Sequence, residues 1–414
     1  MLNNYPKAQN TLSFREKTPI GFKEITLLIL CSIVFINIKG LKPVDYLSIP
    51  VFFLYLPEIL KAFRKILKQP LAVMGAVLFS VSYLLSMWLS DFNTSFVGNL
   101  LLNLILSSIL VSGCSTPRKA SHLIIVLSWS FGLSSVIAWL QYIYILPTFP
   151  GQFEIVRDGR FMSLFGDPNL IGIFSIFLGI YWLGEIINPN PYYRSNIIVS
   201  FTLLAIAFFH LLLSQSRSAW IGFIVAVIAY LIMTSVIKRS RGLVSITFIM
   251  IFLILAASIL IKTTKAGDII IDRIWSVFEN RGVAEEERFT FFYTLRSFQV
   301  ALDNPLGVGP GMTSVITGLT SVDGDPIGAH NTYVQILAEN GWIAGVVFIA
   351  SIVWILYSSI RGGFVDRRRL GISESVISAA FLGLATCGTF HDLIEWRLMW
   401  ILPSIYVAMR IQTQ

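Results

Sequence analysis

The sequence predicts an all-α polytopic membrane protein. Hydrophobic residues make up 55% of the 414 residues, and only 13% are charged. Many of the hydrophobic residues fall in runs of roughly 17–25, which is long enough for a helix to cross a bilayer. A helix satisfies its own backbone hydrogen bonds, whereas a lipid-exposed irregular segment would leave them unpaired. This composition excludes a soluble domain.

The hydrophobic runs predict about twelve transmembrane helices. They are centred near residues 30, 52, 80, 105, 134, 178, 205, 228, 252, 346, 381 and 403. The second and last runs are the weakest, because Pro50, Pro57 and Pro403 interrupt them. We divide the chain into helices one to nine (1–261), a large periplasmic loop with short amphipathic helices (262–329), and helices ten to twelve (330–414).

The N-terminus and the cysteines predict no processing or cross-linking. The first 20 residues are polar, and the first hydrophobic run lacks a small-residue cleavage site, so it is expected to remain as a span or signal anchor. Cys31, Cys114 and Cys387 all lie within hydrophobic runs without paired spacing. They predict neither a disulfide framework nor a thiolate metal site.

The distribution of charge predicts the orientation of the protein in the membrane. If the N-terminus is cytoplasmic, most of the 31 Lys and Arg residues fall in cytoplasmic segments, whereas most of the 23 acidic residues fall outside. Short loops rich in Lys and Arg stay in the cytoplasm. The net charge of +8 therefore indicates orientation and gives no support for nucleic-acid binding.

This orientation places residues 149–168, 215–218, 262–329 and 391–397 on the side opposite the cytoplasm. Basic residues are scarce in these segments, so those that occur there require an explanation. An anionic ligand is one explanation, and an ion pair with the acidic residues of the loop is the other. The residues concerned are Arg157, Arg160, Arg217, Arg288 and Arg296.

Arg217 lies in SQSRSAWIG, a tight turn between two predicted spans. A guanidinium group can donate two parallel hydrogen bonds to a phosphate, and the flanking serines add hydroxyl donors. The alternative is an arginine that extends from a helix end to the membrane boundary. His210 lies seven residues earlier, and a lone histidine on an apolar helix is more often a core residue than part of a site.

Arg160 stands near the start of RFMSLFGDPNLIG, and with Arg157 it is a candidate for anion binding. In the same segment, Asp167 is expected to cap a helix and Pro168 to occupy its first position. Arg288 follows Glu285–Glu287 and precedes an amphipathic pattern that extends to Leu302. Its alternative role is a surface ion pair with those glutamates.

A glycine-rich segment follows at Asn304-Pro305. Gly307, Gly309 and Gly311 resemble a phosphate cradle, but no Gly-Lys-Ser/Thr follows them. The pattern favours a tight turn onto the membrane surface over a nucleotide site.

His330 precedes Asn331 at the start of a hydrophobic run, where Asn331 is expected to cap the helix. Histidine titrates near neutral pH, so His330 can accept a proton from a hydroxyl nucleophile. His391-Asp392 is a weaker candidate, because Asp392 is too close in sequence to orient its neighbour's ring. Asp323 and Asp325 could hold a cation, although such pairs are more often solvated turns, and no histidine cluster supports a metal.

The motifs SQSRSAWIG, PLGVGPGM and AHNTYVQILAENGWIAG together resemble the O-antigen ligase and polymerase family of bacterial envelope proteins. The resemblance covers roughly residues 211–347, and GRFMSLFGDPN and HDLIEWRLMW resemble the flanking elements. It implies a multi-helix inner-membrane transferase whose donor is a glycan on undecaprenyl diphosphate. The acceptor is a lipid A-core sugar in ligases and another lipid-linked repeat in polymerases. No cofactor and no metal are implied.

The resemblance also implies roles for individual residues. His330 corresponds to the family's periplasmic histidine, the catalytic base, and Arg217 and Arg288 correspond to its arginines, with Arg160 as a less secure match. These arginines would bind the diphosphate. Asn331, His210 and His391, which the resemblance does not assign, are further candidates for support of the site. The family motifs leave ligase, polymerase and protein-glycosylating transferase unseparated.

Two alternatives come from other classes. A polysaccharide exporter or flippase is disfavoured because ionisable residues within the predicted spans are nearly absent. A metal-dependent glycosyltransferase would be expected to carry acidic ligands in the first external loop, where this chain offers only Asp45. No paired carboxylates of a glycoside hydrolase stand out.

Overall fold

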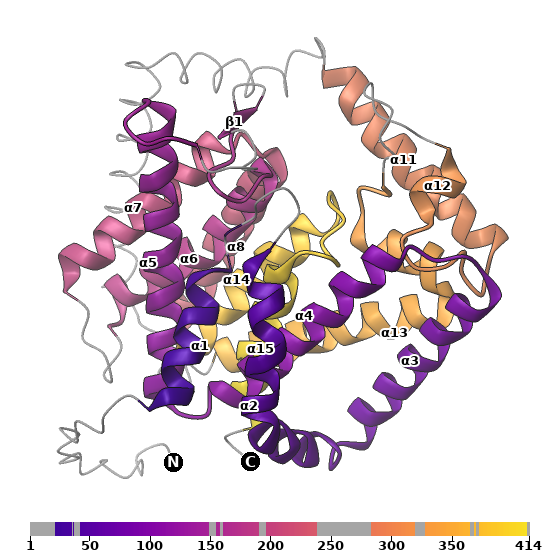
Figure 1. Cartoon of the computed structure of the whole chain (residues 1–414), viewed down its shortest axis with the longest axis horizontal. Helices are drawn as coiled ribbons and strands as arrows, with labels where there is room; N and C mark the ends of the chain where they lie inside the picture. Colours follow the sequence, from indigo (N-terminus) through magenta and orange to yellow (C-terminus); the bar gives the residue numbers. More distant parts are fainter. Residues whose placement is uncertain are drawn as a thin grey trace.

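The computed structural model confirms the all-α fold class (Figure 1). It describes residues 21–34, 36, 42–148, 155–157, 160–189, 196–237, 283–318, 328–364, 368–369 and 372–411. The predicted span near residue 252 lies outside these ranges, as do Asp323 and Asp325.

The described helices agree with the other eleven hydrophobic runs. The first five are α1 (Phe22–Ser32), α2 (Pro43–Ile66), α3 (Pro70–Leu89), α4 (Thr94–Gly113) and α5 (Pro117–Tyr142). The next group is α6 (Pro168–Ile187), α7 (Ile197–Leu213), α8 (Arg217–Ile237), α11 (Val283–Asp303) and α12 (Thr313–Thr317). The last three are α13 (Thr332–Gly363), α14 (Glu374–Cys387) and α15 (Arg397–Ile411). Two antiparallel ribbons pair β1 (Val156–Arg157) with β2 (Arg160–Phe161) and β3 (Arg368–Arg369) with β4 (Ile372–Ser373).

Seven of the described helices are long and apolar enough to cross a membrane: α2, α3, α4, α5, α6, α8 and α13. The protein is therefore a multi-pass membrane protein, and the number twelve remains a prediction. Helices α7 and α14 are apolar but shorter. The prolines of α2 and α15 lie inside continuous helices, at Pro50, Pro57 and Pro403. Packed neighbours can satisfy the backbone groups that such prolines release.

Helix α6 is the centre of the fold, because most of its side chains are buried on all sides. It begins as the sequence predicts, with the Asp167 side chain accepting a hydrogen bond from the Asn169 N–H at 2.7 Å. Helices α7, α8 and α14 pack around it. Between α8 and α14 the backbones approach closely, since a Cβ at Gly222 would lie 2.8 Å from the Gly383 carbonyl oxygen. Small residues permit such contacts in membrane proteins.

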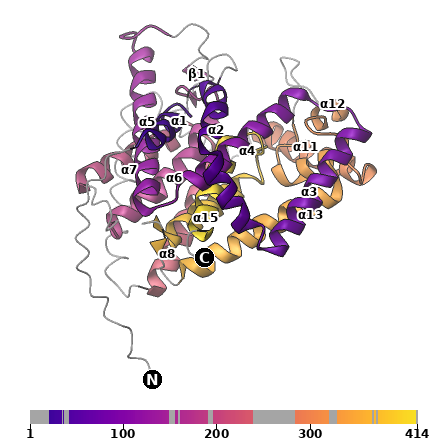
Figure 2. The ribbon, with the colours of Figure 1, turned by 60° about the horizontal axis from the view of Figure 1, so that its bottom comes forward.

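The remaining helices lie on both sides of this core. Figures 1 and 2 both show α5 and α7 on one side of the molecule and α3, α11 and α12 on the other. Helix α13 joins the two parts, because it packs against α3 and α11 as well as α14. Helix α4 packs against α2 and α15. The candidate functional site lies where these parts meet.

Helix α13 is kinked at Gly341, where φ is 82° and ψ is 169°. The kink releases backbone groups, and the glycine-rich turn before α12 binds them. The Ala338 and Glu339 carbonyls accept hydrogen bonds from Val308 N at 2.9 Å and Gly309 N at 3.0 Å. In return, Trp342 N donates to the Pro305 carbonyl oxygen at 3.0 Å. The turn thus packs into the kink of α13, and its N–H groups serve that contact instead of a phosphate.

The glycines of this turn allow close approach to the α3–α4 connection. A Cβ at Gly309 would lie 1.8 Å from the Asp91 carbonyl oxygen, and one at Gly311 would lie 2.7 Å from the Asn93 Cβ. Helix α11, which leads into the turn, begins at Val283. The amphipathic pattern that extends to Leu302 thus belongs to α11, and Arg288 lies within the first turns of this helix.

Candidate functional site

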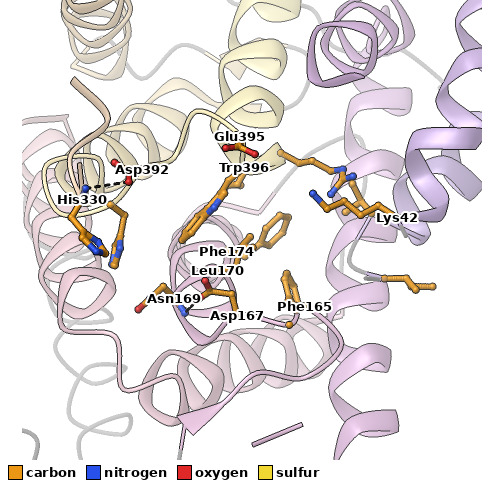
Figure 3. Close-up of a pocket in the computed structure, with 16 residues that line it drawn as sticks. Lys42, Phe165, Asp167, Asn169, Leu170, Phe174, His330, Asp392, Glu395 and Trp396 are labelled. Carbon is orange, nitrogen blue, oxygen red and sulfur yellow. Dashed lines mark hydrogen bonds between the residues drawn. The ribbon is translucent and has the colours of Figure 1, made fainter. Parts of the chain in front are cut away.

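A cavity of about 400 Å³ opens where the connections predicted to be periplasmic come together. Its lining comes from the α1–α2 connection, the start of α6, the start of α13 and the α14–α15 connection. In Figure 3, His330 and Lys42 lie on opposite sides of the cavity, with Asn169 and Asp167 along a third side. The residues with polar side chains are Lys42, Asp167, Asn169, His330, His391, Asp392, Glu395, Trp396 and Arg397.

His330 is held at this cavity by an unusual backbone conformation. Its φ is 49°, a left-handed value that costs roughly 1–3 kcal/mol in a residue other than glycine. The Asp392 carboxylate holds that conformation, because it accepts the His330 N–H at 3.1 Å and the Asn331 N–H at 2.9 Å. A Cβ at Gly328 would lie only 2.2 Å from Asp392 Oδ2, so this approach requires glycine. The ring of Tyr293 lies 5.7 Å from the His330 ring, centroid to centroid.

Asn331 caps α13, as the sequence predicts. Its Oδ1 accepts hydrogen bonds from Tyr333 N at 3.0 Å and Val334 N at 3.1 Å, and its Nδ2 donates to the Thr389 carbonyl oxygen at 3.1 Å. Thr332 adds a second link, since its hydroxyl donates to the His391 carbonyl oxygen at 2.6 Å. The α14–α15 connection therefore sets the position of His330 through several bonds.

Asp392 is a buried carboxyl that accepts hydrogen bonds from two backbone N–H groups. Burial raises its pKa, while the His330 imidazole and the two backbone hydrogen bonds act in the opposite direction. It binds the backbone of His330 rather than the ring of its neighbour His391. The expectation that Asp392 does not orient the His391 ring agrees with this geometry.

His391 connects the cavity to the turn that holds Arg217. Its Nε2 lies 2.6 Å from Ser218 Oγ, and its ring stacks on Trp396 at a centroid distance of 5.9 Å. Burial lowers the pKa of His391 to about 3, and the neighbouring His330 and Arg160 charges act in the same direction. His391 is therefore neutral near pH 7, and its role at the cavity is that of a hydrogen-bonding group.

Arg160 lies beside the cavity on the short β2 strand. Its Nε donates to the Ser214 carbonyl oxygen at 3.1 Å, and its Nη2 donates to Asn169 Oδ1 at 2.7 Å. Asn169 lines the cavity, whereas Arg160 does not. Arg157 pairs with Arg160 across the β1–β2 ribbon. Arg160 thus links the Ser214–Arg217 turn to the first turn of α6.

Arg217 and Arg288 are placed less directly. Arg217 is the first residue of α8 and is partly exposed. It stands between Ser216 and Ser218, whose hydroxyl oxygens lie 3.1 Å apart, and Ser218 contacts His391. Arg288 lies on α11, where the structure describes only the backbone. Arg217 is not among the described residues that line the cavity.

The structure does not bring His210 to the cavity. It is buried near the end of α7, and its Nδ1 lies 2.6 Å from the Ile206 carbonyl oxygen. The rings of Phe131 and Phe161 lie 5.1 and 5.5 Å from its own. His210 is thus a core residue that packs among aromatic rings, the alternative considered from the sequence.

Three charged lining residues were not singled out from the sequence as site candidates. Lys42 precedes α2, where its carbonyl oxygen accepts the Asp45 N–H at 2.8 Å, and among the described residues its ammonium group forms no hydrogen bond or ion pair. Burial lowers its pKa, and the nearby Arg397 acts in the same direction. Arg397 is paired with Asp45, and Glu395 Oε2 accepts a hydrogen bond from Asn99 Nδ2 at 3.0 Å. Glu395 and Arg397 lie in HDLIEWRLMW, which resembles a flanking element of the family. That motif was the sequence signal for these two residues.

Metal ligands were also sought in the part of the chain that the structure describes. It contains no group of three or more His, Cys, Asp or Glu side chains that could hold an ion. The cavity instead combines two histidines, a capped helix start and an ammonium group. This donor set suits a substrate with hydroxyl and anionic groups.

Fold and cavity together define a multi-pass α-helical membrane protein with a polar, histidine-lined site at one end of its helices. Residues 202–349 match the family described as O-Antigen ligase, which confirms the resemblance to O-antigen ligases and polymerases. The matched segment, about a third of the chain, contains Arg217, Arg288 and His330. Members of this family transfer glycans in polysaccharide biosynthesis. No curated protein matches the chain.

Proposed function

We propose that this protein is an inner-membrane glycosyltransferase of the O-antigen ligase type. It transfers a glycan from undecaprenyl diphosphate to a hydroxyl of a lipid A-core or similar acceptor, on the periplasmic side. The observation that carries the proposal is the placement of His330 at the cavity by Asp392, within the segment that matches the family. Donor and acceptor are both membrane lipids, and no nucleic acid takes part.

In the proposed reaction, His330 accepts the proton of the acceptor hydroxyl as its oxygen attacks the anomeric carbon of the donor glycan. The bond from that carbon to the diphosphate oxygen breaks, and undecaprenyl diphosphate leaves with the electron pair. Direct displacement inverts the configuration at the anomeric carbon. The leaving group carries the negative charge, which cationic side chains stabilise.

Arg217, Arg288 and Arg160 are the proposed diphosphate-binding residues. Arg160 is supported by its hydrogen bond to Asn169, which lines the cavity, and Arg217 by the contact of its neighbour Ser218 with His391. Arg288 is supported by its position in α11, whose residue Tyr293 contacts His330. Lys42 adds an ammonium group across the cavity from His330.

Deletion of the gene followed by an envelope glycan gel tests the proposal. Loss of all capped lipopolysaccharide supports the ligase. Retention of single repeat units supports the polymerase of the same family. Complete loss of glycan precursors from the periplasmic side of the membrane supports the exporter or flippase.

We expect residues 262–329 to be periplasmic. The reason is that basic residues gather in the opposite connections, which the positive-inside rule assigns to the cytoplasm. Cysteines introduced at Ser321 and Ser240 would be treated with a membrane-impermeant thiol reagent in cells with a permeabilised outer membrane. Labelling at Ser321 alone is the expected result, and labelling at Ser240 alone would reverse the orientation of the site.

We expect Asp392→Asn to impair transfer, because asparagine would hold the His330 backbone less firmly than the aspartate does. The change replaces one charged acceptor oxygen by an amide donor, and hydrogen bonds to charged groups contribute roughly 1.5–3 kcal/mol. The rate should therefore fall at least about tenfold. In a His330→Ala background the same change should have almost no further effect on transfer, because the two residues act as a unit. Equal losses in both backgrounds would show that Asp392 serves only stability.

A further inference from the structure

Helix α11 carries an exposed apolar stripe that nothing in the proposed reaction uses. Phe291, Leu295, Phe298 and Leu302 are 66%, 49%, 36% and 54% exposed. Their spacing of four, three and four residues places them on one line along the helix. In a segment predicted to lie in an aqueous compartment, such a stripe requires a partner.

The stripe is distinct from the face that packs α11 onto the rest of the protein. That face consists of Ser297, Val300 and Ala301, which are buried. Val300 and Ala301 form a small core with Leu337 of α13, and the Trp342 indole donates to the Ala301 carbonyl oxygen at 2.8 Å. Phe298, at the edge of the stripe, also contacts α13, since its ring lies 6.3 Å from the Trp342 ring, whereas the buried contacts come from the other face.

A third face of α11 is polar and exposed. It carries Arg296, Gln299 and Asp303 together with one exposed aromatic residue, Phe292, and Arg296 Nη1 donates to Gln299 Oε1 at 3.1 Å. Helix α11 thus has one face against protein, one apolar face and one polar face. A helix with this division is suited to lie in the plane of a membrane–water interface.

The apolar surface continues beyond α11 toward a membrane-spanning helix. Leu306 in the turn is 49% exposed, and Val315 and Ile316 on α12 are 57% and 51% exposed. The turn is bonded to the end of α3, since Asn93 N donates to the Pro310 carbonyl oxygen at 2.9 Å. Trp88, at that end of α3, is 82% exposed, and α3 is long and apolar enough to cross a membrane. Figures 1 and 2 show α12 beside the α3–α4 connection.

We propose that α11 lies in the membrane interface, with its apolar stripe among lipid acyl chains and its polar face toward water. The continuity of the stripe with the exposed surface of a spanning helix identifies lipid as the occupant. This inference goes beyond the proposed reaction and does not require it.

The contact has a consequence for the site. Thr294 Oγ1 on α11 donates to the Ala329 carbonyl oxygen at 3.0 Å, and Tyr293 packs on the His330 ring. A helix anchored in the interface would therefore hold His330 near headgroup depth. If the proposed function is correct, this is the depth at which the diphosphate of a lipid-linked donor lies.

The experiment compares neighbouring positions on the two exposed faces. Single cysteines replace Leu295 and Arg296 in the full-length protein and carry an environment-sensitive nitrobenzoxadiazole label; Leu302→Cys and Asp303→Cys form a second pair. The native Cys31, Cys114 and Cys387 are buried, and the labelled parent protein measures their background. The variants are reconstituted in phosphatidylethanolamine–phosphatidylglycerol vesicles, with spin-labelled lipid or aqueous iodide as the quencher.

We expect the labels at positions 295 and 302 to be quenched by shallow spin-labelled lipid at least about threefold more than those at 296 and 303, since an interfacial helix buries its apolar face ~5–10 Å deep. Iodide should give the reverse order. Equal access of iodide to all four positions would overturn the proposal. Protection of 295 and 302 from both quenchers, relieved by diluting the protein in lipid, would also overturn it and indicate a second copy of the chain. No outcome depends on glycan transfer, so failure of the proposed reaction is measured separately.

Discussion

Replacing His330 by alanine is expected to abolish transfer. His330 stands at the cavity, and the proposed role is to accept the proton of the acceptor hydroxyl. General-base contributions are typically about 10²–10⁴-fold in rate. The measurement is transfer from purified lipid-linked donor to acceptor in vesicles, with the amount of membrane-inserted protein determined in parallel.

The left-handed backbone at His330 calls for a second variant. Alanine at φ 49° is strained, whereas asparagine adopts this region more readily but cannot serve as a base near pH 7. His330→Asn should therefore keep the thermal stability of the parent protein and still lose transfer. His122→Ala provides the matched control, because His122 contacts Glu24 and neither residue lines the cavity. Near-normal transfer by a well-expressed His330→Asn protein would remove His330 from the mechanism.

Local sequence signals predicted the helices and their starts. Long hydrophobic runs gave the helix positions, because burial in lipid leaves the helix as the solution for the backbone. Asp167 and Asn331 were predicted as caps, and both side chains accept hydrogen bonds from the first turns of α6 and α13. These features depend on residues within a few positions of one another. The kink at Gly341 was not predicted, since it depends on the turn around Pro305 and Gly309.

The cavity could not be predicted from neighbours in the sequence. Arg397 pairs with Asp45, 352 positions earlier, and Asp392 binds the backbone of His330 across 62 positions. From the sequence, Asp392 was considered only beside His391, because no local pattern reveals a contact to a distant N–H. Lys42 is another such case, since only the fold brings the α1–α2 connection to the start of α6. His210 shows the converse, a residue near a candidate arginine in sequence whose side chain faces the core.

Replacing the arginines is the second change with a large expected effect. If Arg217 and Arg288 grip the diphosphate, both their geometry and their charge matter, because lysine keeps the charge but loses the two-pronged hydrogen bond. Each Arg→Lys change should then impair transfer, and each Arg→Ala change should impair it more. Hydrogen bonds to charged groups contribute roughly 1.5–3 kcal/mol, which corresponds to about 10–150-fold in rate when the bond forms only in the transition state.

Arg296 is the matched control for these variants, because it lies on the same helix as Arg288 and is exposed. Among the described residues, its side chain forms a hydrogen bond with Gln299. Changing it to lysine or alanine should leave transfer almost unchanged. Thermal stability is measured for every variant beside transfer from purified lipid-linked donor. If Arg217 and Arg288 merely pair with nearby acids or reach the membrane boundary, lysine should serve almost as well, and even alanine should be mild, since an exposed pair contributes only about 0–1 kcal/mol. Full transfer in both lysine variants with mild loss in both alanine variants would exclude the diphosphate role. If transfer is lost only in proportion to thermal stability, the arginines stabilise the fold and do not bind the diphosphate.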